Sequence, residues 1–172
     1  MDGATHTGRM AMTALAKAPW QAVFAASSSL VLGVSYGVSA LLQVAYSGDR
    51  MAIETRLPEY QGVSGLESAS AVELHEWLAL SATVFAVVAA LFVVLGVLVW
   101  QGVGRPGVRL TLTISALVAF IGSLVPLFMG TSGANAVTED TVVFLLVVHG
   151  FALVGALLLW GRGARAWINE PA

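Results

Sequence analysis

Four long apolar stretches are the feature that most constrains how this chain can fold. They cover residues 20–44, 77–100, 108–129 and 141–160, and their interiors carry no lysine, arginine, aspartate or glutamate. About 20 apolar residues in an α-helix cross the ~30 Å hydrocarbon core of a bilayer. Because lipid offers the backbone no hydrogen-bond partners, such spans are helices. The sequence therefore predicts an all-α integral membrane protein built as a four-helix bundle.

The predicted layout is one transmembrane domain, residues 19–165, between two short tails. The tails comprise residues 1–18 and 166–172, and a loop at about 45–69 is the only sizeable segment outside the membrane. The helices of the domain are expected at about 20–44, 71–100, 108–130 and 139–161.

Basic residues sort by the side of the membrane on which they are expected. Six lie before the first helix, between the second and third, or after the fourth, against two in the 45–69 loop: Arg9, Lys17, Arg105, Arg109, Arg162 and Arg165 against Arg50 and Arg56. Lysine and arginine in short loops mark the cytoplasmic side. Both tails are therefore predicted to be cytoplasmic. One lysine beside seven arginines is typical of GC-rich coding, so a multi-pass protein of a prokaryotic plasma membrane is expected.

Composition argues against most enzyme classes. There is no cysteine, which excludes disulfides, thiolate metal ligands and a cysteine nucleophile. The segment from Glu73 to Glu76 contains His75 but lacks the second histidine of a zinc-hydrolase motif. No serine–histidine–aspartate set is visible, and a net charge of −2 indicates no nucleic-acid partner. A non-catalytic role is favoured.

Small residues recur every four positions along the first predicted helix, at Ala25, Ser29, Gly33 and Gly37. The last two form a G-x-x-x-G motif, and small residues at this spacing let helix backbones approach closely in lipid. Packing inside the protein's own bundle is favoured over a homo-oligomer interface, because four helices already offer enough partners.

Local signals mark further elements. The i,i+4 pair Arg50 and Glu54 is compatible with a short surface helix in the loop. Ser70 and Glu73 form a capping-box pattern that starts the second long helix. Pro126 frees a carbonyl of the third helix and is expected to kink it.

Two histidines, His75 and His149, are the first candidates for a functional site. Ionisable residues within spans are expensive and often functional. Imidazole is a common axial ligand of haem iron, so a b-type haem between the second and fourth helices is one interpretation. Counted from the predicted caps Ser70 and Thr138, however, the two histidines differ in depth by six residues, about 9 Å.

The alternative is two histidines that are satisfied separately. His75 would then be an interfacial residue beside Glu73 and Glu76. His149 would be a neutral core histidine bonded to a hydroxyl from the first or third helix.

Three short motifs resemble those of an uncharacterised family of four-helix bacterial membrane proteins. The motifs are Gln43-Val44, Leu74-His75 and Val148-His149. More loosely, the chain resembles small b-type cytochromes and haem-bearing membrane anchors of respiratory enzymes. This chain departs from the family at Gly150 and Phe151, where a proline is usual, and in its longer outer loop.

The expected function is that of an anchor or accessory subunit of a membrane complex. One b-type haem ligated by His75 and His149 would serve electron transfer. A cofactor-free transporter or channel component is the first alternative, with the polar residues of the first helix and the Pro126 kink lining a path. A structural partner acting through the outer loop is the second. The lipid bilayer, other membrane subunits and a second copy of the chain are the partners considered.

Overall fold

The computed structural model describes residues 18–61, 68, 70–102, 106–129 and 139–164, without the side chains of 50, 52, 56, 59–61, 125–129 and 139–142. In this part of the chain the structure is all-helical and contains no strand, which confirms the predicted all-α class. The helices are α2 (Trp20–Gly48), α3 (Arg50–Gln61), α4 (Ala71–Trp100), α5 (Pro106–Met129) and α6 (Glu139–Leu158).

Three of these helices are long and apolar enough to span a membrane. They are α2, α4 and the Pro106–Leu124 portion of α5, among the residues for which this can be judged. The remaining apolar helix, Val143–Leu158 within α6, is shorter. Length and composition therefore agree with a membrane-spanning protein.

The ends of α2, α3 and α4 follow local sequence chemistry. The capping box of α4 is confirmed, with the Ser70 backbone N–H donating to Glu73 Oε2 at 2.8 Å and the Ser70 hydroxyl accepting from the Glu73 backbone N–H at 3.3 Å. The short helix with which the Arg50 and Glu54 pair is compatible is present in the 45–69 loop as α3. However, α2 continues past the expected end at residue 44 to Gly48, because no charged residue or helix breaker intervenes before Gly48 and Asp49.

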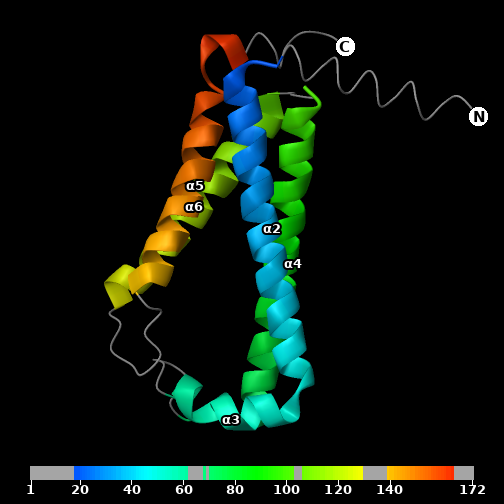
Figure 1. Cartoon of the computed structure of the whole chain (residues 1–172), viewed down its shortest axis with the longest axis vertical. Helices are drawn as coiled ribbons and strands as arrows, with labels where there is room; N and C mark the ends of the chain where they lie inside the picture. Colours follow the sequence, from blue (N-terminus) through cyan, green and yellow to red (C-terminus); the bar gives the residue numbers. More distant parts are fainter. Residues whose placement is uncertain (1–17, 62–67, 69, 103–105, 130–138, 165–172) are drawn as a thin grey trace, which may run out of the picture.

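The helices form two antiparallel hairpins, α2 with α4 and α5 with α6 (Figure 1). Packing of α6 on α2 joins the hairpins, whereas α4 and α5 hardly touch. Figure 1 shows the α5–α6 hairpin leaning away from α2 and α4 toward the end where α3 lies across the molecule. The hairpins are therefore closely packed at one end and apart at the other.

Close backbone contact joins α2 to α4. A Cβ added at Gly33 would lie 2.8 Å from Val93 Cγ2 and 3.1 Å from the Ala89 carbonyl oxygen. A Cβ at Gly96 of α4 would lie 3.2 Å from the carbonyl oxygen of Ala26 on α2. At Gly37 the nearest atom would be 3.8 Å away, an ordinary contact. The tight part of the α2 stripe is thus at Gly33, one helical turn before Gly37.

A second close approach joins α2 to α6. A Cβ at Gly155 would meet Ser28 Oγ at 2.6 Å and Ala25 Cα at 3.0 Å. Beside it, the rings of Phe24 and Phe151 meet edge to face with their centroids 6.1 Å apart. Ala25 and Ser29, which share the stripe with Gly33, are both 1% exposed.

Just beyond the same end of α6, Trp160 contacts α5. Its indole N–H donates to Thr113 Oγ1 at 3.0 Å, and the guanidinium of buried Arg109 lies 5.5 Å from its ring centroid. This arrangement gives the buried cation a π-face. The predicted kink at Pro126 and the cap at Thr138 fall outside the described side chains.

Candidate functional site

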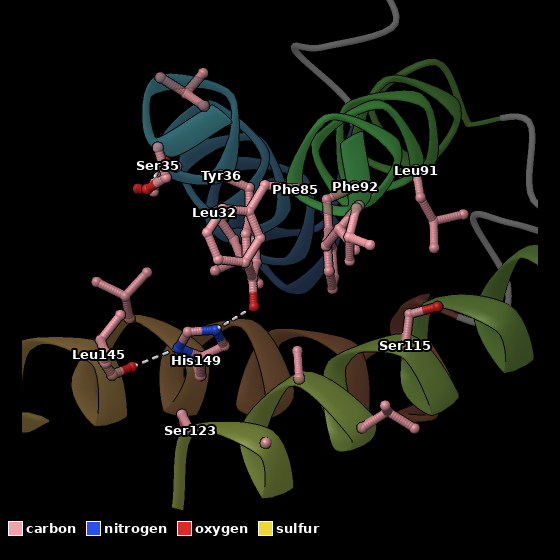
Figure 2. Close-up of a pocket in the computed structure, with 18 of the residues that line it drawn as sticks. Leu32, Ser35, Tyr36, Phe85, Leu91, Phe92, Ser115, Ser123, Leu145 and His149 are labelled. Atoms are coloured by element: carbon pink, nitrogen blue, oxygen red, sulfur yellow. Dashed lines mark hydrogen bonds between the residues drawn. The ribbon is translucent and has the colours of Figure 1, made fainter. Parts of the chain in front are cut away.

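Where the two hairpins separate, they enclose a cavity of about 900 Å³ (Figure 2). Side chains of α2, α4, α5 and α6 line it, and most of them are apolar. The polar atoms of the lining come from four serines, one tyrosine and one histidine. The cavity is therefore an apolar space with a few fixed hydrogen-bonding groups, which is the usual composition of a small-molecule site.

Tyr36 extends from α2 into this space. Phe85 and Phe92 of α4 hold its ring, with centroids at 5.6 Å and 6.3 Å, and the Phe92 ring lies nearly parallel to it at 5°. These contacts point the phenol hydroxyl across the cavity toward α6, as Figure 2 shows. The aromatic neighbours fix the hydroxyl on the side of the cavity opposite its own helix.

His149 of α6 forms a hydrogen bond with that hydroxyl. The Tyr36 Oη lies 2.8 Å from His149 Nε2, and His149 Nδ1 lies 2.6 Å from the Leu145 carbonyl oxygen. Both ring nitrogens therefore have hydrogen-bond partners within the protein, and the histidine side chain is only 4% exposed. This contact is of the kind expected for a core histidine bonded to a hydroxyl from the first or third helix, and the hydroxyl is that of Tyr36 on the first. The bond also links the two hairpins.

His75 lies elsewhere in the molecule. It is exposed near the start of α4, and its Nδ1 lies 2.9 Å from the Ser47 carbonyl oxygen at the end of α2. The partners of the two histidines, Tyr36 and Ser47, are eleven residues apart on α2, about 16 Å at 1.5 Å per residue. The structure therefore does not bring His75 and His149 together.

The described contacts do not bring His75 and His149 together as the two axial ligands of one haem. Two axial ligands must meet across a single iron atom. His75 of α4 and His149 of α6 instead contact α2 at points about 16 Å apart along that helix. Both nitrogens of His149 are also engaged, with Tyr36 and Leu145.

Gln43, singled out by the family resemblance, lies outside the cavity lining. Its side-chain oxygen accepts a hydrogen bond from the Ser81 hydroxyl of α4. Both residues are partly buried, and the bond joins the last part of α2 to the first part of α4. Its contact is between helices and not with the cavity.

Tyr36 is the site residue that sequence reasoning missed. The available signal is its depth, because tyrosines of membrane proteins concentrate at the two interfaces, whereas Tyr36 lies well inside an apolar span. Phe85 and Phe92, seven residues apart on α4, share the helix face that supports it.

No family model, curated protein sequence or solved structure matches this chain.

Proposed function

We propose that this chain is a four-helix, multi-pass protein of a prokaryotic plasma membrane, with both termini in the cytoplasm. Three apolar helices and the shorter apolar helix in α6 support four crossings. The six-to-two distribution of basic residues supports the orientation. In this topology α3 lies at the outer surface, at the end of the molecule where the two hairpins are apart (Figure 1).

We infer a non-catalytic role in this membrane, which is to bind a lipid-soluble molecule between the hairpins as an accessory subunit. The observation that carries the proposal is the apolar cavity of about 900 Å³ with the Tyr36–His149 pair on its wall. Small-molecule sites are typically ~300–1,000 Å³, mostly apolar, with few polar groups that set orientation. Other membrane subunits remain the proposed partners.

The depth of the pair supports a ligand that comes from the bilayer. His149 lies eleven residues before Trp160, an aromatic residue at the inner end of α6, which corresponds to about 16 Å along the helix. Half of a ~30 Å hydrocarbon core is a similar distance. The polar pair therefore lies near the middle of the apolar layer, where a water-soluble molecule would rarely arrive.

The cavity opens sideways toward lipid. Val84 of α4 and Ile114 and Val118 of α5 line it and are also 50%, 52% and 64% exposed. Because α4 and α5 hardly touch, the opening between them would face acyl chains. Lateral access favours a binding protein over the transporter or channel alternative, which needs a path between the two aqueous sides.

Photolabelling in lipid nanodiscs tests this proposal. The probe is 4-octylphenol carrying a diazirine in its alkyl chain, and mass spectrometry maps the labelled residues. We expect label on the cavity-lining parts of α2 and α5. Ser115→Trp should fill the cavity and reduce this label several-fold, since Ser115 lines it. Leu117→Trp is the matched control on the same helix, at an exposed residue outside the lining.

Label spread evenly over the lipid-facing helices would contradict the proposal, as would cavity label that Ser115→Trp leaves unchanged. Melting temperatures of both tryptophan variants, measured in the same nanodiscs, separate cavity filling from loss of the fold.

A further inference from the structure

Hydrogen-bond geometry fixes which group donates at the Tyr36–His149 pair. A carbonyl oxygen only accepts, so the 2.6 Å contact with Leu145 places a hydrogen on Nδ1 of His149. The other nitrogen of a neutral imidazole then carries no hydrogen and accepts. With a neutral imidazole, Tyr36 therefore donates its hydroxyl hydrogen to Nε2. The tyrosine oxygen keeps lone pairs, and it has no hydrogen left for a ligand.

The hydroxyl hydrogens of three lining serines are also already used in hydrogen bonds within the protein. Their hydroxyls donate to backbone carbonyls of their own helices, Ser35 to Val31 at 2.9 Å, Ser39 to Ser35 at 3.0 Å and Ser123 to Phe120 at 2.7 Å. Each of these oxygens can still accept a hydrogen bond. The fourth, Ser115, lies on α5 apart from the Tyr36–His149 pair (Figure 2).

Building on the proposed function, we propose that the cavity selects a molecule with a hydrogen-bond donor, an alcohol or a phenol on an apolar body. The hydroxyl of such a ligand would donate to Tyr36 Oη. A ketone or ether oxygen at the same place would face acceptor lone pairs. Buried acceptors that gain no donor are unfavourable by enough to discriminate between ligands of one shape.

The test compares two competitors with the same body. In nanodiscs, 4-octylphenol and 4-octylanisole differ only by the methyl group that removes the donor. Each competes with the octylphenol photoprobe for the cavity label. We expect octylphenol to compete at about tenfold lower concentration, the ratio that corresponds to one lost hydrogen bond of typical strength.

Two variants assign the preference to the pair. Tyr36→Phe combined with His149→Leu removes both the Tyr36 oxygen and the imidazole nitrogen behind it, so the two competitors should become equal. Tyr46→Phe removes a hydroxyl from the outer end of α2, outside the cavity lining, and should keep the tenfold difference. His149→Leu leaves the Tyr36 hydroxyl hydrogen free to donate. In this variant the concentration of 4′-octylacetophenone, a ketone of similar shape, needed to displace the probe should fall relative to that of octylphenol.

Equal competition in the wild type, or stronger competition by the anisole, would overturn this inference while the cavity label stands. Octylphenol that fails to displace the probe would overturn it as well. A wild type without cavity label would overturn the proposed function and the inference with it. Since the decisive comparison uses the wild type, it does not depend on the folding of any variant.

Discussion

The Tyr36–His149 hydrogen bond joins two hairpins of apolar helices, and in the proposed membrane setting no water replaces a lost partner. Tyr36→Phe leaves His149 Nε2 without its donor and should lower the free energy of unfolding by about 1 kcal/mol. His149→Leu leaves the phenol hydrogen without its acceptor and should have a similar effect. Thermal unfolding of the wild type and both variants in one detergent measures both effects.

The double variant separates the bond from general packing. If the two groups act on each other, Tyr36→Phe with His149→Leu should destabilise less than the sum of the single changes, by about 0.5–2 kcal/mol. Strictly additive losses would mean that the two side chains are stabilised independently, against the geometry described here.

At this scale, sequence reasoning reached part of the site. The separate satisfaction of His149 by a hydroxyl could be inferred because an isolated buried imidazole needs a partner. Which hydroxyl it would be could not be inferred, because that depends on how α6 is rotated about its axis against α2. The haem hypothesis requires His75 and His149 to be neighbours on parallel helices. Their hydrogen-bond partners, however, lie about 16 Å apart along α2.

The contact of α2 with α4 predicts different effects on stability for the same substitution at Gly33 and Gly37, the two glycines of the G-x-x-x-G motif. Gly33→Ala places a methyl group against Val93 and the α4 backbone and should destabilise by about 1–3 kcal/mol. Gly37→Ala finds an ordinary contact at 3.8 Å and should leave the stability unchanged or slightly raised. Equal melting temperatures of the two variants would contradict the described packing.

The start of α4 allows an independent measurement. Ser70→Ala removes the side-chain cap on Glu73 and should lower the free energy of unfolding by about 1 kcal/mol. Ser68→Ala, two residues earlier and also exposed, is the matched control and should have little effect. If both changes act alike, the capping box contributes nothing measurable.

Helices and caps could be predicted because they follow from neighbouring residues, as Ser70 with Glu73 illustrates. Contacts between distant residues could not. Gly155 has no motif around it, yet it is the point where α6 meets α2. Gly102 follows α4 with a φ of 69°, a conformation that favours glycine and that no sequence motif marks. A substitution there would be strained, whereas a Cβ at Gly107 would meet no atom within 4 Å.

For the whole molecule, the orientation in the membrane is the first prediction. A cysteine at Ser68, before α4, should react with an impermeant maleimide in intact cells, whereas a cysteine at Gly163, after α6, should react only after lysis. The reason is the distribution of basic residues about the helices. The opposite labelling pattern would reverse the topology and place α3 inside the cell.

The divergence of the hairpins is the whole-molecule feature that sequence could not supply. Four apolar spans predict four packed helices, since periodicity identifies which residues can face a neighbour. It does not give the angle between pairs of helices. Here close contact at Gly155 and the separation of α4 from α5 leave the space that Tyr36 and His149 share.

The nitrogen resonances of His149 test the central claim most directly, that a ligand cavity lies at a Tyr36–His149 pair inside the membrane. In ¹⁵N-histidine-labelled protein in nanodiscs, with His149→Leu used for assignment, we predict a protonated Nδ1 and an unprotonated Nε2. Addition of 4-octylphenol should shift the Nε2 resonance, because the ligand donates to the phenol that is bonded to it. A protonated Nε2, or an Nε2 resonance that octylphenol leaves unmoved at saturation, would contradict the account.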